Sequence, residues 1–233
     1  MKKIILNDVN FKVKDKDILK NIDLTINEGE SVVILGPNGA GKTTLINCIL
    51  KLQKIDSGEV INDFESLPRY KIGFHSQEQS FYKLLKVKEI LDLFLFEGDY
   101  MHLVKKYGLD NNLNQKIGEL STGEFKKLSL IILLENNPEI IFIDEITTGL
   151  DTITRMEVLN FLKNELKKSG KTIVMVTHYL EEVEEISEKL IFLKKGKIVE
   201  LGLKDDLYNK YNLNYSENNL TVLYTQVYKE DIK

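Results

Sequence analysis

The sequence predicts an α/β protein built around a mainly parallel sheet. Short, almost wholly apolar runs, typical of buried strands, alternate with helical patterns along the chain. Continuous apolar strands of this kind occur in parallel sheets that helices cover on both faces. The 233 residues are enough for one large domain or two small ones, and 42% hydrophobic residues are ordinary for a globular protein. We therefore expect an α/β fold with a sizeable buried core.

The predicted strands are short and rich in Val, Ile and Phe. Lys195-Gly196 divides one apolar run into a hairpin, with strands over residues 189–193 and 197–200. The remaining predicted strands cover residues 4–13, 30–35, 71–74, 140–143 and 171–177.

Helical patterns fill the segments between these strands. Ser121 and Glu124 fit the S-x-x-E capping box, and the apolar run after them predicts a buried helix. Gly170 is a suitable residue to end the last long helix. The mostly helical segment from about 80 to 136 interrupts the alternation, so we expect an inserted helical subdomain there. The other predicted helices cover residues 42–52, 87–96, 99–107 and 152–168.

Charge and cysteine content exclude several classes of protein. The formal net charge is −4 and basic residues are spread along the chain, which argues against a nucleic-acid partner. The lone Cys48 excludes a disulfide framework and any metal site that needs several cysteines. The longest apolar run, residues 130–134, is far shorter than the roughly 20 residues of a membrane helix. We expect a chain that does not itself cross a membrane.

A glycine-rich loop predicts a nucleoside triphosphate site. Residues 36–43 fit G-x-x-x-x-G-K-[ST] in full, with an apolar strand before the loop and a helix after it. Glycines let backbone N–H groups turn toward a phosphate chain, and the helix N-terminus adds partial positive charge. Lys42 would reach the β- and γ-phosphates, and the Thr43 hydroxyl would bind Mg²⁺. The predicted nucleotide-binding residues of this loop are Gly36, Pro37, Asn38, Gly39, Ala40, Gly41, Lys42, Thr43 and Thr44.

Polar residues at the ends of two other strands predict the hydrolytic groups. Asp144 and Glu145 follow the apolar run 140–143, and the carboxyl end of such a strand lies beside the phosphate loop in sheets of this type. Asp144 could hold the Mg²⁺ shell, and Glu145 could act on the water that attacks the γ-phosphate. His178, after the strand 171–177, could hydrogen-bond the γ-phosphate. Taken alone, these residues would better fit a solvated strand end and a surface histidine, and the phosphate loop is what favours the hydrolytic interpretation.

From residue 4 to 207 these motifs resemble, in order, the nucleotide-binding subunit of ATP-binding cassette (ABC) transporters. The resemblance implies the ABC-ATPase P-loop fold, with an antiparallel β subdomain and an inserted helical subdomain. It further implies one ATP-binding domain over residues 1–233, with a short C-terminal extension over about 208–233. Its motifs here are Leu120-Ser121-Thr122-Gly123-Glu124 as the signature, Gln77 as the Q-loop glutamine, Thr148-Gly149-Leu150-Asp151 as the D-loop and His178 as the switch histidine.

The resemblance implies an ATPase that works as a head-to-tail dimer, either a homodimer or a pseudo-dimer with a second ATP-binding subunit. Each ATP would lie between the phosphate loop of one subunit and the signature of the other, where Ser121 and the Gly123 backbone contact the γ-phosphate. Gln77 would touch Mg²⁺ or the attacking water, and Asp151 would organise the facing subunit. The dimer would sit peripherally on the cytoplasmic face of the cell membrane and power an integral membrane permease.

Several alternatives stay open at this point. Residues 177–184 resemble the ATPase subunits of exporters with separate ABC-2-type permeases, which favours export. The alternatives are an importer subunit, a non-transport ABC protein and a cassette that binds ATP without hydrolysing it. Thr122 replaces the usual first glycine of the signature, and Val13 stands where an aromatic residue often stacks on adenine. Residues 220–228 could add an edge strand or a small accessory contact.

Overall fold

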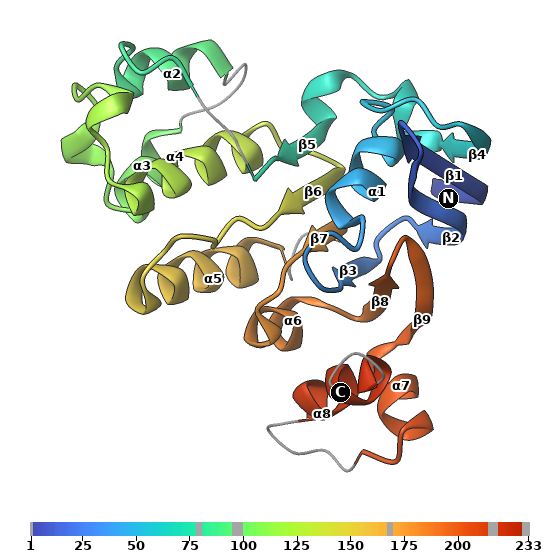
Figure 1. The fold of residues 1–233 in the computed structure, drawn as a ribbon. Helices are drawn as coiled ribbons and strands as arrows, with labels where there is room; N and C mark the ends of the chain where they lie inside the picture. The colour runs from blue at the N-terminus through green and yellow to red at the C-terminus, as the bar shows by residue number, and fades with distance from the viewer. Residues whose placement is uncertain (1, 78–80, 95–99, 167–169, 214–218, 230–233) are drawn as a thin grey trace. The chain divides into compact units, whose positions relative to one another are not determined.

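The computed structural model describes residues 2–77, 81–94, 100–166, 170–213 and 219–229, which group into two compact units. Unit 1 comprises Met1–Ser66 and Gly170–Lys233, and unit 2 comprises Leu67–Ser169. Figure 1 traces the elements of both units along the chain. The single domain inferred for residues 1–233 stays a prediction.

A three-stranded antiparallel sheet forms one part of unit 1. Its order is β2-β1-β4, with β1 spanning Lys3–Val13, β2 spanning Lys16–Asn27 and β4 spanning Ser57–Asn62. Only β1 was predicted. The signal for β2 was present nonetheless, because Ile22, Leu24 and Ile26 alternate with exposed or half-buried residues and are themselves buried.

The second sheet of unit 1 supports the phosphate loop. Strand β3 (Ser31–Leu35) runs parallel to both β7 (Thr172–Val176) and β8 (Lys189–Lys194), and β9 (Lys197–Leu203) pairs antiparallel with β8. Every residue of β3 and β7 is buried, as expected for parallel strands with both faces covered. The helices of unit 1 are α1 (Lys42–Ile49), α6 (Leu180–Ile186), α7 (Lys204–Lys210) and α8 (Asn219–Val227), with a 3₁₀ turn over Asp63–Ser66.

Unit 2 contains a parallel strand pair and most of the predicted helical segment. Strand β5 (Ile72–His75) pairs with β6 (Ile140–Asp144). Helix α4 contacts α2, α3 and α5, and its buried side chains join those of α2 and α3 in one apolar core. The helices of unit 2 are α2 (Val87–Phe94), α3 (Met101–Lys106), α4 (Thr122–Glu135) and α5 (Thr152–Leu166), with 3₁₀ turns over Arg69–Lys71, Asp110–Asn112 and Ile117–Glu119.

The α/β class and the parallel strands are confirmed, whereas one of the two alternatives for residues 220–228, the edge strand, is wrong. Residues 220–228 do not form an edge strand, because α8 spans Asn219–Val227 and buries Leu220 and Leu223 on one side. Their spacing of three is helical rather than alternating. Helix α1 ends at Ile49, three residues before its predicted end, and the predicted helix ends at 95–96, 99 and 167–168 lie outside the described residues.

Candidate nucleotide-binding site

Backbone conformation shapes the glycine-rich loop in unit 1. The loop leaves β3 and enters α1, whose N-cap Gly41 has a φ of 106°, a left-handed value that suits glycine. No side chain caps α1 at Gly41. Pro37, Asn38 and Gly39 are exposed, so the outer part of the loop is open to a ligand.

Lys42 lies against the loop that precedes it. Its side chain is buried, and its Nζ donates to the Gly36 carbonyl at 2.9 Å and to the Pro37 carbonyl at 3.2 Å. The next residue, Thr43, is exposed. The predicted phosphate-binding lysine is therefore held at the loop, while the predicted Mg²⁺-binding hydroxyl belongs to an exposed residue at the start of α1.

The β8–β9 hairpin supports the loop from beneath. A Cβ placed on Gly36 would lie 2.3 Å from the Leu193 carbonyl oxygen, so only glycine fits at that position without a backbone shift. At the hairpin turn, the Gly196 N–H donates to the Ala40 carbonyl at 3.0 Å. The loop therefore rests on main-chain atoms, whose positions vary less than those of long side chains.

His178 also lies in unit 1, directly after β7 and Thr177. The Tyr179 N–H donates to the Thr177 hydroxyl at 3.0 Å, which shapes the turn around the histidine. The imidazole is exposed, and its ring centroid lies 4.2 Å from that of Tyr179. The position after a core strand agrees with the predicted position, although the γ-phosphate contact itself stays a prediction.

In unit 2 the structure brings two predicted catalytic residues together. The Gln77 amide Nε2 donates to Glu145 Oε2 at 3.1 Å, and the Thr148 hydroxyl donates to the same oxygen at 3.3 Å. Asp144, the last residue of β6, is buried. Glu145 has a φ of 47°, an unfavourable left-handed conformation for a residue with a Cβ, and such strain clusters at functional sites.

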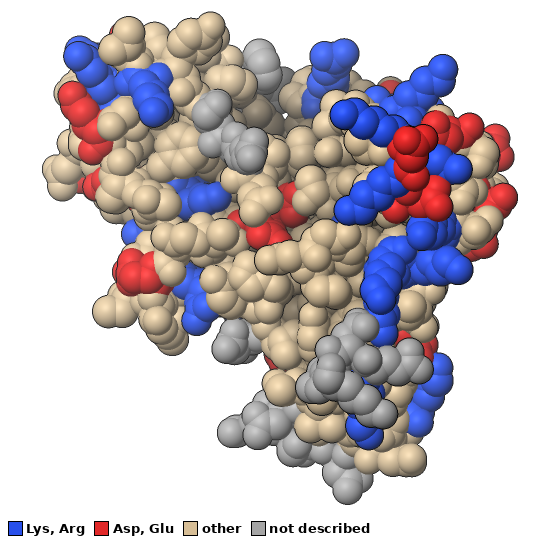
Figure 2. Space-filling model, viewed as in Figure 1, with Lys and Arg blue, Asp and Glu red and all other residues tan. Residues whose placement is uncertain are grey.

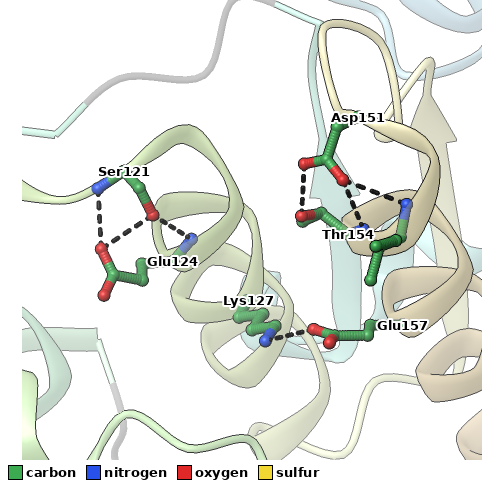
Figure 3. A network of polar contacts seen from close by, with 7 residues as sticks. Ser121, Glu124, Lys127, Asp151, Thr154 and Glu157 are labelled. Atoms are coloured by element: carbon green, nitrogen blue, oxygen red, sulfur yellow. Dashed lines mark hydrogen bonds and ion pairs between the residues drawn. The ribbon is translucent and has the colours of Figure 1, made fainter.

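The signature segment forms the capping box that the sequence predicts (Figure 3). The Ser121 hydroxyl accepts from the Glu124 N–H at 3.3 Å, and Glu124 Oε2 accepts from the Ser121 N–H at 2.7 Å and its hydroxyl at 2.8 Å. The hydrogen bond from the Ser121 backbone lowers the pKa of Glu124, with smaller contributions from the Ser121 hydroxyl, Asn112 and Lys127. Ser121 itself is exposed.

The D-loop aspartate caps the neighbouring helix in the same unit (Figure 3). Asp151 Oδ1 accepts from the N–H groups of Ile153 and Thr154 at 3.0 and 3.1 Å, and Oδ2 accepts from the Thr154 hydroxyl at 2.6 Å. These contacts, led by the Thr154 hydroxyl, lower the pKa of Asp151. The exposed carboxylate is thereby held at the start of α5.

Thr154 joins the D-loop to the signature, a contact that sequence reasoning missed. A Cβ placed on Gly123 would lie 2.6 Å from Thr154 Cγ2, so the first turns of α4 and α5 pack closely. One turn further, Lys127 Nζ and Glu157 Oε2 form an ion pair at 2.6 Å. An Asp with Thr three residues later is a local capping pattern, but nothing in the sequence places that Thr methyl on Gly123.

The residues predicted to hold Mg²⁺ offer the right donor types. Asp144 supplies a carboxylate, Gln77 an amide oxygen and Thr43 a hydroxyl, all hard oxygen ligands of the kind Mg²⁺ takes together with substrate phosphates. Thr43 belongs to unit 1 and the other two to unit 2. Within the described ranges no three or more His, Cys, Asp or Glu residues cluster as a metal cage. The oxygen donors of these three residues are of the type that Mg²⁺ takes, and their common role in one metal site stays a prediction.

No helix in the described part of the chain is long and apolar enough to cross a membrane. Figure 2 shows acidic as well as basic side chains on one face of the molecule, with large areas of neither kind between them.

Comparisons with known proteins show the family of the chain. The family model described as ABC transporter matches residues 19–148, a range that holds the phosphate loop, Gln77, the signature, Asp144 and Glu145. The match ends before Asp151 and His178. Among curated relatives, a glutamine transport ATP-binding protein of Geobacillus stearothermophilus is 32% identical over 88% of this chain and 93% of its own length. A spermidine/putrescine import ATP-binding protein of Mycoplasma mycoides is 30% identical over 88% of this chain and 62% of its own length.

A solved bacterial ABC transporter cassette, MJ0796, has a similar fold. Its dimeric structure matches with a TM-score of 0.74 at 32% identity, covering 86% of this chain and 98% of the cassette. A second structure of the same cassette, a dimeric post-hydrolysis state bound to ADP and Pi, matches with a TM-score of 0.73 at 31% identity over the same shares of both chains. The likeness agrees with the ABC-ATPase fold expected from the sequence.

Proposed function

Since the chain belongs to the ABC transporter family as an ATP-binding subunit that hydrolyses ATP, we propose that two copies close head to tail around two ATP molecules and power a separate permease. The observation that carries the proposal lies in unit 2. Ser121 and Asp151 are both exposed, and close packing of Gly123 on Thr154 joins the helices that they cap. Groups held in place but open to solvent suit recognition of a second subunit.

The residues of the site divide the chemistry between binding and water activation. Lys42 would hold the β- and γ-phosphates together with backbone N–H groups of the loop, for which Pro37 has none to offer, and with the Thr44 backbone. Thr43, Asp144 and Gln77 would hold Mg²⁺, which neutralises phosphate charge when bound.

Glu145 would accept the proton of the attacking water as a general base. The Gln77 amide, which donates to Glu145 Oε2, would orient that carboxylate, and the Thr148 hydroxyl would assist. His178 would hydrogen-bond the γ-phosphate.

In the proposed dimer, the signature of one copy faces the nucleotide of the other. The positive end of the α4 dipole and the N–H groups of its first turn would then meet the γ-phosphate. Ser121 would add its hydroxyl, and Gly123 its backbone. Thr122, which starts α4 and is exposed, leaves the capping box intact.

We propose that unit 2 also carries the contact with the permease at the cytoplasmic face of the membrane. Large apolar side chains are exposed in the segment that follows Gln77, with Tyr82 at 83% and Leu84 at 79% exposed. On α2, Leu93 is 60% exposed. Exposed apolar side chains grouped in one segment mark protein interaction sites. Their proximity in sequence to Gln77 would link docking to the catalytic groups.

We propose export as the direction of transport, on the resemblance of residues 177–184 to exporter subunits. Import is the second candidate, because the Mycoplasma mycoides relative is named as a spermidine/putrescine import protein. Reconstitution of the intact complex in vesicles of one orientation distinguishes the two. ATP-driven loss of solute from the compartment that faces the subunit supports export, and accumulation in that compartment supports import.

The proposed hydrolytic mechanism is tested by Glu145→Gln. Loss of a general base is worth about 10²–10⁴ in kcat, and we expect this drop together with a stable ATP-bound dimer in size-exclusion chromatography. Ser121→Ala in the same background should weaken that dimer, because the signature hydroxyl is absent. Unchanged turnover in Glu145→Gln would remove Glu145 from the role of base, and an ATP-independent monomer would contradict the dimer.

A further inference from the structure

Tyr228, near the C-terminal end of the described chain, contacts the base of the phosphate loop. Its hydroxyl donates to the Leu35 carbonyl at 3.2 Å and to the Leu193 carbonyl at 3.1 Å. The side chain is buried, with 3% of its surface exposed. Tyr228 and Leu35 are 193 residues apart in the sequence. A buried phenol shared between two strand-end carbonyls is a specific tertiary contact.

The Leu35 carbonyl belongs to the peptide bond that opens the phosphate loop. Because a peptide unit is planar, holding this C=O also fixes the direction of the Gly36 N–H. The next carbonyl, that of Gly36, accepts from Lys42 Nζ at 2.9 Å. A continuous chain of contacts therefore runs from the Tyr228 hydroxyl through Gly36 to the ammonium group predicted to hold the phosphates.

The second acceptor of the Tyr228 hydroxyl, the Leu193 carbonyl, also lies next to Gly36. The Leu193 carbonyl oxygen is the atom that would lie 2.3 Å from a Cβ on Gly36, so it already packs against the loop. By bonding both this oxygen and Leu35, Tyr228 holds together the ends of β8 and β3. These two strands pair in parallel, and the phosphate loop follows directly after β3.

Aromatic packing fixes the phenol in position. The Tyr228 ring lies 4.6 Å from Tyr224 and 6.0 Å from Phe192, measured between centroids. Helix α8, directly before Tyr228, contacts α7 and also α6, the helix that begins two residues after His178. Figure 1 shows α7 and α8 side by side. The segment 219–228 thus contacts both the strand residue directly before the phosphate loop and the helix after the predicted switch histidine.

We propose that Tyr228 is a positioning residue for ATP, whose hydroxyl holds the Leu35–Gly36 peptide in the orientation that the phosphate loop needs. The C-terminal segment then affects how tightly the phosphate loop binds ATP, although it is not itself part of that loop. This inference rests on the proposed assignment of residues 36–43 as the nucleotide site. Because the loop holds ATP before and during hydrolysis, Tyr228 should affect KM for ATP more than kcat.

Two variants of the C-terminal segment supply the test, one at Tyr228 directly after α8 and one at Tyr224 within it. Tyr228→Phe removes only the hydroxyl. Tyr224→Phe is the matched control, because in the described part of the chain the Tyr224 hydroxyl makes no hydrogen bond. Titration of the full chain with MgATP should show a Kd about three- to tenfold higher for Tyr228→Phe, the range that one lost hydrogen bond gives. Tyr224→Phe should stay within about twofold of the parent, by the same reasoning.

Further measurements separate positioning from general destabilisation. The steady-state KM for ATP should rise with the Kd while kcat stays within about twofold. The reason is that the lost interaction stabilises bound ATP and the transition state equally. The amide nitrogen resonance of Gly36 should shift in ATP-free Tyr228→Phe and stay in place in Tyr224→Phe.

An unchanged Gly36 resonance with parental Kd would overturn the positioning role, as would equal Kd increases in both variants. If the parent chain fails to bind MgATP while the Gly36 shift is seen, the proposed nucleotide site fails and the Tyr228 contact stands without its function.

Discussion

The two helix N-termini that we propose to meet phosphate, that of α1 in unit 1 and that of α4 in unit 2, are built in different ways. The N-cap of helix α1 is Gly41, which has no side chain to cap the helix, and the loop before it rests on main-chain atoms of a hairpin, the Leu193 carbonyl and the Gly196 N–H. The N-cap of helix α4 is Ser121. Its hydroxyl accepts from the Glu124 N–H, and the Glu124 carboxylate accepts from the Ser121 N–H. A loop that must wrap a ligand leaves its donors open, whereas a surface that waits for a second subunit is stabilised by its own side chains.

Adding one methyl group to a glycine of each region should show this difference most strongly. In Gly36→Ala the new Cβ meets the Leu193 carbonyl oxygen at 2.3 Å, and the backbone must shift. We expect a loss of about 3 kcal/mol of unfolding free energy, the upper part of the range for overpacking. Urea denaturation of the purified chain measures it.

In Gly123→Ala the new Cβ would lie 2.6 Å from the Thr154 methyl, a group that a second substitution can delete. We expect a smaller loss of about 1 kcal/mol, since the helix preference of Ala offsets part of the clash. With Thr154→Ser as background, which keeps the hydroxyl bonded to Asp151, Gly123→Ala should cost nothing. A similar loss in both backgrounds would mean that Gly123 and Thr154 do not pack as described.

Removing the cap of α4 should have an intermediate effect. Ser121→Ala deletes the acceptor of the Glu124 N–H, and loss of an N-cap costs about 1 kcal/mol. The thermal unfolding midpoint should fall slightly while ATP turnover per folded molecule falls much further, because the hydroxyl also faces the second nucleotide in the proposed dimer. If turnover per folded molecule is unchanged, Ser121 acts only as a cap.

The smallest expected effect depends on pH and occurs in unit 2. Hydrogen bonds from Ser121 lower the pKa of Glu124 below its ordinary value of 4.5. The stabilisation is therefore fully present above pH 4.5 and is lost as the pH falls through the lowered pKa. For a half-exposed carboxylate we expect less than about 1 kcal/mol.

The difference in unfolding free energy between the parent chain and Glu124→Gln should stay constant near neutral pH and shrink below pH 4.5. A difference that persists into acid would mean that the carboxylate charge is not what stabilises the cap.

The sequence allowed the phosphate loop and the capping box to be predicted, because both depend on residues close together in the chain. Gly41 needs its left-handed φ, and Ser121 needs only Glu124 three residues later. Thr154 and Tyr228 could not be found this way, since their partners are distant in the sequence. The segment 220–228 could not be assigned because its apolar residues suit either a strand or a helix, and packing on α6 and α7 selects the helix.

The contacts beneath the phosphate loop have a consequence for folding during synthesis. The loop, residues 36–43, is synthesised before the groups that support it, which are Leu193, Gly196 and Tyr228. Such long-range contacts carry a large loop-closure entropy and form slowly. A ribosome-bound chain that ends before residue 228 therefore holds the glycine-rich motif without its complete support. High affinity for ATP should be acquired only after residue 228 has been synthesised and has folded onto the loop.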